Sequence, residues 1–508
     1  MKKNIILLAL LANALFSTFA AEVTQKLIVA PGTISATSAT LVWDKPDNFT
    51  DIIRYHVLLN GKDVATSAKC NYMLNGLSPQ KAYSCTVKAE MKNGKQTDIV
   101  PSVKFTTKPL GKTLDVTQFG AKGDGTTINT KAIQQAIDAC PANGTVFIPQ
   151  GTFVSGAIFL KSHMTLLIAK GGVLKGSIDE ADYLPYINNR FEGWELKTYA
   201  SLVNAGVMNN KGGYTVEDLA IKGEGTISGG NTPLAKKMIA KDGLRCRGRL
   251  ICLLNCHNVD IQGLNIQDSP CWTIHYIYSE GVTCHDLNIV STAANGDGLD
   301  PDSSDDSYIF NCTFSTGDDC IAIKSGKNPE GYTIGKPTRN VRITDCDFVK
   351  GHGISIGSEI SGGVSDVLVQ DCKAGALLHG MQIKATKERG AYVKNVTVAD
   401  CQLLQITVFS QLNYNNDGAG APEPPIFANF TFRNIDLSKA TGKAPVMDLN
   451  GFKDDAHKLK DCTFTNIVTP DNARVVIKDA DGLKFTNVQS ATGAKPVYEV
   501  TNSTNVIN

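Results

Sequence analysis

One short pattern recurs along the second half of the chain and restricts its fold more than any other feature. From about residue 214 onward, octads such as 259–266 and 341–348 alternate hydrophobic and polar side chains and usually carry Asp or Asn near the middle. One hydrophobic position of the octad recurs at intervals of 23 to 34 residues. It is occupied by Leu264, Leu287, Cys312, Cys346, Cys372, Cys401 and Ile435.

Repeats of this length with strand-like alternation, and without a helical segment between them, are typical of a right-handed parallel β-helix. Successive coils stack at the strand spacing of about 4.8 Å, so one octad position forms a column that runs through the interior. We therefore predict an all-β protein with a β-helix over residues 113–508, and we exclude helical repeat arrays. The amphipathic segment Thr130–Ala139 predicts a helix that caps the N-terminal end of the β-helix.

The chain contains 14 cysteines, a number that in an exported protein suggests disulfides. Their spacing argues instead for packing, because five of them are predicted to share one interior column: Cys312, Cys346, Cys372, Cys401 and Cys462. Cys70 and Cys85 lie in the N-terminal region, where a disulfide bridge and two free thiols are equally compatible with the sequence. There is no CxxC pair to suggest a zinc site.

The N-terminal region predicts export and a small separate domain. Lys2 and Lys3 precede an apolar run over residues 5–16 and then small residues, which is typical of a signal peptide at 1–21. Residues 22–108 show short alternating strands with Asn-Gly turns, which predicts a small β-sandwich; Trp43, Tyr83 and the following strand resemble a fibronectin type III domain. We expect an exported protein, periplasmic or extracellular, without a membrane-spanning segment.

Charge restricts the possible partners. The chain has 50 Lys and Arg residues against 49 Asp and Glu residues, which gives a net charge of +1. This charge is too small to attract the phosphate backbone of nucleic acid, so we expect no nucleic-acid partner. Any anionic partner must therefore be bound locally.

Polar residues gather on a second strand of each predicted coil. When Leu299, Ile321, Ile354 and Met381 are placed in one column, Asp297, Asp319, His352 and His379 stack at the edge of that strand. The same alignment stacks Asp300 with Ala322, Ser355 and Gln382, and it stacks Asp302 with Lys324, Gly357 and Lys384. Carboxylates stacked one coil apart repel each other, so this arrangement favours a catalytic site over a structural role.

Two carboxyl groups suffice for glycoside hydrolysis, one protonated and one ionised. Asp297 and Asp319 are placed to hold a water molecule, and Asp318 is placed to keep a proton. Lys324 and Lys384 share one face beside these acids, where they are suited to bind a substrate carboxylate. A calcium site is the alternative chemistry, with oxygen ligands from Asp297, Asp300, Asp302, Asp305 and Asp306.

Three motifs on successive predicted coils carry a family resemblance. Asn295-Gly296-Asp297, Gly317-Asp318-Asp319-Cys320 and Gly351-His352-Gly353 resemble the signature blocks of family 28 glycoside hydrolases, the polygalacturonases. Residues 119–125 and 144–149 resemble the N-terminal block of the same superfamily. The resemblance implies that Asp318 is the general acid, that Asp297 and Asp319 position the attacking water, that His352 assists, and that the reaction inverts the anomeric configuration without a metal or other cofactor.

The sequence departs from the family pattern at one position. The fourth family block is Arg-Ile-Lys, whereas this chain has Gln382-Ile383-Lys384. The loss of the guanidinium leaves Gln382 and Lys384 to bind the leaving-side sugar and puts the identity of the uronide in doubt. Tyr414 matches a family tyrosine that stacks near the leaving sugar, although a buried structural tyrosine is equally compatible with the sequence.

Further stretches, among them the one that begins with the substrate-binding candidate Arg249, resemble the exo-acting bacterial branch, which also carries fibronectin-like domains. We therefore expect a monomeric exo-polygalacturonase that acts on pectic polysaccharide. Hydrolysis of rhamnogalacturonan or xylogalacturonan, a calcium-dependent pectate lyase, and a non-catalytic polysaccharide-binding β-helix remain the alternatives.

Overall fold

The computed structural model describes residues 27–46, 51–410 and 418–507, so the predicted signal peptide and Tyr414 lie outside the described residues. The chain forms two compact units. One consists mainly of Leu41–Tyr72 and Ala82–Phe105, and the other mainly of Thr106–Asn508. The described residues contain no helix long and apolar enough to cross a membrane.

The N-terminal region forms two small sheets, as the alternating strands predict. The four-stranded sheet pairs β3 with β4 and β6 in antiparallel register and has the order β4 (Lys62–Ser67), β3 (Ile52–Leu59), β6 (Ala82–Met91), β7 (Gln96–Thr106). The three-stranded sheet has the order β1 (Ile28–Val29), β2 (Ser38–Val42), β5 (Asn71–Asn75). Trp43 and Tyr55 are buried in this region and meet edge to face.

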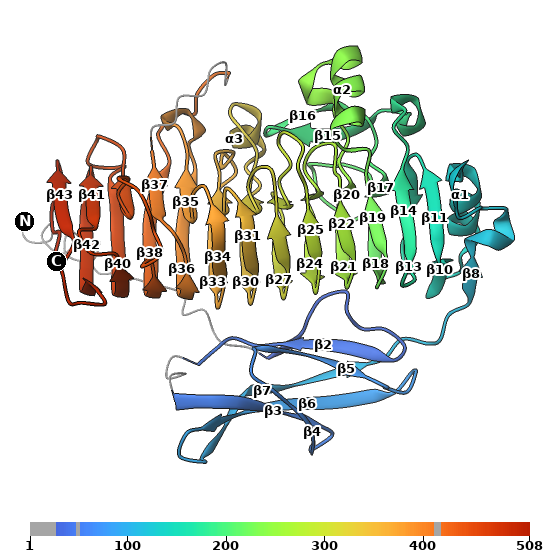
Figure 1. Ribbon diagram of the computed structural model, residues 1–508, viewed down its shortest axis with the longest axis horizontal. Coiled ribbons are helices and arrows are strands. Elements are labelled where there is room, and N and C mark those ends of the chain that lie inside the picture. The colour runs from blue at the N-terminus through green and yellow to red at the C-terminus, as the bar shows by residue number, and fades with distance from the viewer. Residues whose placement is uncertain (1–26, 47–50, 411–417, 508) are drawn as a thin grey trace, which may run out of the picture. The chain divides into compact units, whose positions relative to one another are not determined.

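The rest of the chain is a right-handed parallel β-helix, and the prediction of its fold is confirmed (Figure 1). One sheet of twelve strands runs along its length: β12 (Ile158–Leu160), β17 (Val203–Gly206), β20 (Ile251–Leu254), β23 (Ile274–Ile277), β26 (Leu299–Asp302), β29 (Ile321–Ile323), β32 (Ile354–Ile356), β35 (Met381–Lys384), β37 (Ile406–Phe409), β39 (Met447–Asn450), β41 (Arg474–Lys478) and β43 (Val497–Thr501).

A sheet of 22 strands forms the remaining walls, and most coils contribute two strands to it. The first strands of these pairs are β8 (Thr113–Asp115), β10 (Gly144–Ile148), β13 (Met164–Ile168), β18 (Val216–Gly223), β21 (Cys256–Gln262), β24 (Glu280–His285), β27 (Asp305–Phe310), β30 (Thr338–Thr344), β33 (Val364–Gln370), β36 (Tyr392–Gln402), β38 (Ile426–Asp436), β40 (Leu459–Thr469) and β42 (Ala480–Ser490). The second strands are β9 (Asp124–Ile128), β11 (Gly151–Ser155), β14 (Gly172–Gly176), β19 (Thr226–Ser228), β22 (Asn265–Gln267), β25 (Asn288–Val290), β28 (Thr313–Ser315), β31 (Asp347–Gly351) and β34 (Lys373–Leu377).

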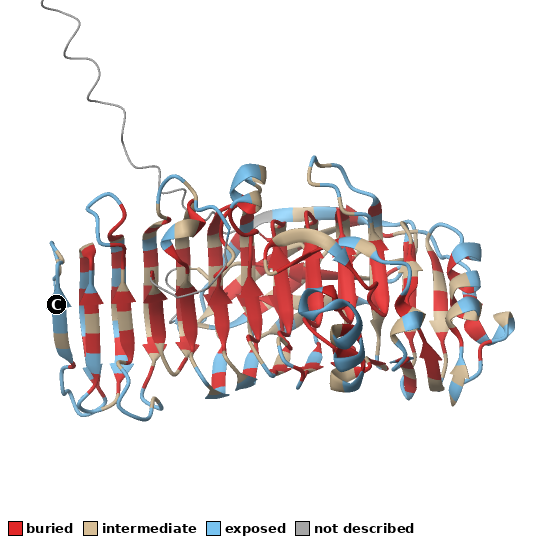
Figure 2. Cartoon of the chain, turned by 90° about the horizontal axis from the view of Figure 1, so that it is seen from above, coloured by how far each residue is buried: buried red, intermediate tan, exposed pale blue. Residues whose placement is uncertain are grey.

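The octads form these wall strands, and their hydrophobic residues line the interior. Ile261, for example, lies in register with Cys284, which in turn lies in register with Ile309. All three side chains are fully buried. Buried residues fill the strands in Figure 2, whereas the turns at the edges are largely exposed. The alternation of hydrophobic and polar residues in the sequence therefore predicts correctly which side chains form the core.

The Asp or Asn in the middle of the octad has a conformational role. It stands where the chain turns from the first wall strand into the second, and there the backbone adopts positive φ, as at Asp286, Asn311, Asp345 and Asp371. Asn and Asp tolerate this left-handed conformation better than other residues that carry a Cβ. Farther along, the amides also stack between coils, with Asn434 donating to Asp400 at 2.8 Å.

In the described part of the β-helix unit, three α-helices and one hairpin lie outside its two sheets. The predicted helix is confirmed as α1 (Thr130–Ala139), which buries Ile133, Ala136 and Ile137 at the N-terminal end of the β-helix (Figure 1). The sequence analysis did not predict α2 (Asn231–Asp242) or the short α3 (Glu330–Ile334). It also did not predict the antiparallel hairpin of β15 (Ile187–Phe191) and β16 (Trp194–Thr198).

The cysteines are buried and form no disulfides in the structure, as the packing interpretation predicts for the interior column. Cys312, Cys346, Cys372 and Cys401 do share one column, because their flanking strands pair at the same offsets, and Ile435 continues it. The prediction that Cys462 belongs to this column was wrong. The register of β38 with β40 stacks Ile467 on Ile435, so Cys462 precedes the column position on β40. Cys70 and Cys85 form no disulfide with each other, and both are buried.

Replacing one column cysteine tests this packing role. Cys346→Ala removes a buried sulfur between two neighbouring coils, and we expect the small cavity to lower the free energy of unfolding by roughly 1–3 kcal/mol. Hydrolytic activity should stay at the wild-type level. Urea unfolding followed by circular dichroism measures the change. A loss of activity without a loss of stability would contradict a purely structural role for this thiol.

Candidate active site

The twelve-stranded sheet brings the predicted acids together. Leu299 pairs with Ile321, Ile321 with Ile354, and Ile354 with Met381. This register stacks the residues two positions earlier, so Asp297, Asp319, His352 and His379 form one column immediately before the strands β26, β29, β32 and β35 begin. The alignment made from the sequence is therefore the register of the structure.

Tight turns set these side chains at the strand edge. Asn295 has a left-handed backbone with φ of 54° just before Asp297. After His352, the chain turns at Gly353, where φ is +103° and an added Cβ would come within 2.3 Å of the carbonyl oxygen of Gly380. Only glycine fits there, which explains the Gly after the histidine.

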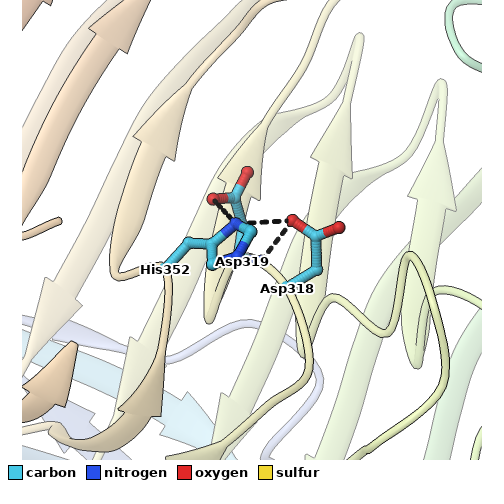
Figure 3. Close-up of side chains that lie close together, drawn as sticks. All are labelled: Asp318, Asp319 and His352. Atoms are coloured by element: carbon cyan, nitrogen blue, oxygen red, sulfur yellow. Dashed lines mark hydrogen bonds and ion pairs between the residues drawn. The ribbon is translucent and has the colours of Figure 1, made fainter. Parts of the chain in front are cut away.

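Figure 3 shows that the carboxylates of Asp318 and Asp319 lie close to the imidazole of His352. His352 Nδ1 lies 2.9 Å from Asp318 Oδ1 and 3.8 Å from Asp319 Oδ1. The hydrogen bond to Asp318 raises the pKa of His352. Burial opposes ionisation of Asp318, but the hydrogen bond and charge of His352 outweigh it, so the pKa of Asp318 is lowered. The two groups therefore hold one proton between them.

Each of the two more deeply buried acids has its own lysine. Lys384 Nζ lies 3.1 Å from Asp319 Oδ2, while the hydroxyl of Ser355 donates to Asp319 Oδ1 at 2.8 Å. Lys324 Nζ lies 3.2 Å from Asp297 Oδ2. Burial raises the pKa of Asp297 well above its usual value, and the charge of Lys324 only partly offsets this. The lysines thus counter the repulsion between the stacked carboxylates.

The structure places the predicted substrate-binding residues differently. Lys384 is partly exposed at the site, with 14% of its side-chain surface open to solvent. Lys324 is only 4% exposed and pairs with buried aspartates, so it is not free to bind a substrate carboxylate as predicted. Gln382 is buried in the column between Ser355 and Thr407.

Arg249 is not available for substrate binding as predicted. It is only 1% exposed, and its guanidinium donates to the backbone carbonyl oxygens of Arg247 at 2.5 Å and Arg190 at 2.6 Å. It lies over the ring of Trp272, 4.6 Å from the ring centroid. Arg249 therefore supports the inserted hairpin through Arg190 and packs against the ring of Trp272.

The aspartates considered as calcium ligands do not converge on one point. Asp302 pairs with Arg190 at 2.6 Å, and burial notwithstanding, that charge lowers the pKa of Asp302 to about 2. Asp305 pairs with Arg339 and Asp306 accepts from Asn340, whereas Asp297 and Asp300 face Lys324. Within the described chain, the one group with metal-ligand proximity is Asp318, Asp319 and His352, and Lys384 places a positive charge against it.

Sequence reasoning missed how the inserted hairpin is held. Arg190 of β15 reaches into the twelve-stranded sheet, where it binds Asp302 and donates to Ser303 Oγ at 2.8 Å. On β16, the indole of Trp194 donates to the carbonyl oxygen of Asn328 at 2.9 Å, next to α3. No signal in the sequence indicated these contacts, because the two partners lie more than 100 residues away along the chain.

Comparisons with known proteins find three family models that match parts of the chain. The model of the glycosyl hydrolases family 28 matches residues 189–468, a model of the rhamnogalacturonase A/epimerase, pectate lyase-like type matches 113–172, and a fibronectin type III model matches 25–104. The chain is 27% identical to an exo-poly-alpha-D-galacturonosidase of Dickeya chrysanthemi, over 95% of this chain and 93% of that protein.

Solved structures show the same likeness. A family 28 exopolygalacturonase of Yersinia enterocolitica aligns with a TM-score of 0.83 at 26% identity and covers 95% of this chain and 98% of its own. A hyperthermoactive exopolygalacturonase of Thermotoga maritima aligns with a TM-score of 0.62 at 26% identity, over 78% of this chain and 92% of its own.

Proposed function

The chain belongs to the glycosyl hydrolases family 28, and from this premise we propose that it is an exo-acting polygalacturonase that hydrolyses α-1,4-galacturonosyl links with inversion. The observation that carries the proposal is the stacking of Asp297, Asp319 and His352 on consecutive coils with Asp318 beside them. Acids and proton donors in this arrangement are what a glycosidase needs on the two sides of a scissile bond.

In this proposal Asp318 protonates the leaving oxygen. In the free protein the shared proton resides on His352, which donates it to Asp318 at 2.9 Å. A sugar that covers the partly exposed pair removes water, and a neutral acid and imidazole are then favoured over an ion pair. The proton passes from His352 Nδ1 to Asp318, and from Asp318 to the glycosidic oxygen as its bond to C1 breaks.

Asp297 and Asp319 activate the water in this proposal. The water oxygen forms the new bond to C1 on the opposite face of the sugar, and its proton goes to one of these carboxylates. Lys384 holds Asp319 in place, and its side chain is partly exposed at the site. Lys384 therefore also serves as the contact for a galacturonate carboxylate, while the neutral Gln382 replaces the guanidinium of the family pattern.

Exo action is supported by the relatives and by the clamped hairpin. The hairpin β15–β16 is tied to the catalytic sheet through Arg190 and to the α3 segment through Trp194. Glu195 of the hairpin also accepts from the hydroxyl of Tyr278 at 2.5 Å. A wall held this firmly beside the acids can close one end of a cleft, which restricts cleavage to a chain end.

We also propose that the enzyme is exported and monomeric. Export is supported by the leader-like composition of residues 1–21, which agrees with a polymeric substrate outside the cell. The substrate class is pectic polysaccharide. A substrate panel of polygalacturonate, xylogalacturonan and rhamnogalacturonan identifies the polymer.

Asp318→Asn tests the role of the general acid. The amide preserves shape but carries no transferable proton, so we expect kcat to fall by roughly 10³-fold or more while KM stays near the wild-type value. Reducing-end release from polygalacturonate measures both. Asp347→Asn, which changes an exposed aspartate on β31, is the matched control and should be silent. Near-normal turnover by Asp318→Asn would remove this residue from the mechanism.

A product time course tests the reaction and the exo mode together. On polygalacturonate we expect monomer or dimer from the first time points, nearly constant viscosity, no new ultraviolet absorbance, and full activity in EDTA. Unsaturated, chelator-sensitive products would instead mean a lyase. Intermediate oligomers at early times would overturn exo action. Release only from xylogalacturonan or rhamnogalacturonan would show that Gln382 marks a different substrate.

A further inference from the structure

Beneath the site, a buried cluster joins Asp297 through Lys324 to Asp300, an acid that has no role so far. Lys324 lies between two carboxylates, with its Nζ 3.2 Å from Asp297 Oδ2 and 3.1 Å from Asp300 Oδ1. Asp297 stands at the strand edge beside Asp318, whereas Asp300 lies inside β26 and is fully buried. The cluster thus connects a proposed catalytic group to one that a substrate cannot touch.

The environment of Asp300 favours its neutral form. In the described structure neither of its carboxyl oxygens has a hydrogen bond of good geometry, although both are shielded from water. Burial raises the pKa of Asp300 to about 6 despite the ion contact with Lys324. A buried carboxyl group with few and poorly directed hydrogen bonds takes up a proton readily because its charged form is poorly solvated.

Lys324 is held as a cation and is closed off from the cleft. Burial opposes its charge, but Asp297 and Asp300 outweigh burial and raise the pKa of Lys324 well above its usual value. The ring of Trp272 covers the ammonium, with 4.2 Å between Nζ and the ring centroid. One cation facing two acids is neutral overall when the acids share one proton.

From this geometry we propose that Lys324 and Asp300 are positioning residues for Asp297. The pair shares one proton. With substrate bound, that proton lies on Asp300, which the substrate cannot touch, and Lys324 bridges the pair so that Asp297 faces the substrate as the ionised base. The inference rests on the proposed hydrolysis in that Asp297 is taken as the base. It assigns to Lys324 a task other than binding the uronate carboxylate.

Other charged groups face this cluster from the neighbouring coils. Asp297 also faces Asp318 and Asp319, and Asp300 also faces Arg249 and stacks beside the buried His275 of β23. Lys324 additionally faces Glu359 and Asp319. Burial lowers the pKa of His275 to about 4, so His275 stays neutral where the cluster takes up its proton. Asp297 and Asp300 are the two acids of the cluster that exchange this proton.

The pH dependence of two variants tests the proposal. In Asp300→Asn, Lys324 serves Asp297 alone, the pKa of Asp297 falls, and the acidic limb of the kcat/KM profile should move to lower pH. In Lys324→Met the two acids lose their cation, so that limb should move to higher pH. There kcat should also fall by roughly 10²- to 10⁴-fold, while KM stays within about twofold of the wild-type value because the substrate does not touch the lysine.

Controls separate this role from its alternatives. Lys373→Met removes an exposed lysine of β34 and should leave the profile unchanged. A rise in KM without a change in the profile of Lys324→Met would mean that Lys324 binds the substrate carboxylate. A shift of the alkaline limb in Asp300→Asn would mean that Asp297 is the acid. Both results would overturn the proposal, and a matching thermal unfolding curve confirms that each variant is folded.

A measurement without substrate keeps the inference independent of the proposed hydrolysis. Infrared difference spectra of the full chain near pH 6, close to the pKa of Asp300, should show a protonated carboxyl band that disappears in Asp300→Asn. If the wild-type protein fails to hydrolyse pectic substrates but shows this band, the proposed function fails and the shared proton stands. If the same band persists in Asp300→Asn, the proton is not on Asp300.

Discussion

The active site depends on the register with which the strands of the twelve-stranded sheet stack. This register places acids from neighbouring coils at the strand spacing of about 4.8 Å. Two carboxylates at that distance repel by about 3 to 4 kcal/mol at an effective dielectric constant of about 20. The fold therefore tolerates the column only because Lys324 and Lys384 from the same sheet face it. The lysines stabilise the arrangement of acids that the chemistry requires.

The surrounding coils keep this register rigid. The left-handed Asp and Asn corners let the chain turn sharply between wall strands, and the column from Cys312 to Cys401 fills the interior beside them. A slip of one residue in such a parallel stack would exchange interior and exterior side chains throughout a coil. The same patterning that specifies the core thus also specifies which polar residues meet at the site.

Much of this arrangement could be predicted from the sequence. Periodicity alone aligned Asp297 with Asp319 and His352, because register follows from the hydrophobic positions. It could not show that Lys324 is sealed beneath Trp272, since depth below the surface depends on packing from other segments. The misplacement of Cys462 has a related cause: consecutive octads differ in their offsets, and β40 pairs 32 residues back with β38.

The hairpin anchor escaped prediction because its contacts are distant in sequence. Arg190 and Asp302 are 112 residues apart, and neither lies in a periodic position that indicates the other. The charge of Arg249 suggested that it binds an anionic substrate. In the structure, its buried guanidinium instead donates hydrogen bonds to backbone carbonyl oxygens. Charged residues in an insertion therefore need a structure before they can be assigned to substrate or to scaffold.

The central claim is a single displacement by water held between acids on neighbouring coils. The anomeric form of the first product tests it most directly. Proton NMR spectra recorded within the first minutes of polygalacturonate hydrolysis should show the β-anomer of the released uronide before mutarotation equilibrates it, because one displacement at C1 inverts the α-link. Initial release of the α-anomer would require a covalent intermediate and would contradict the account.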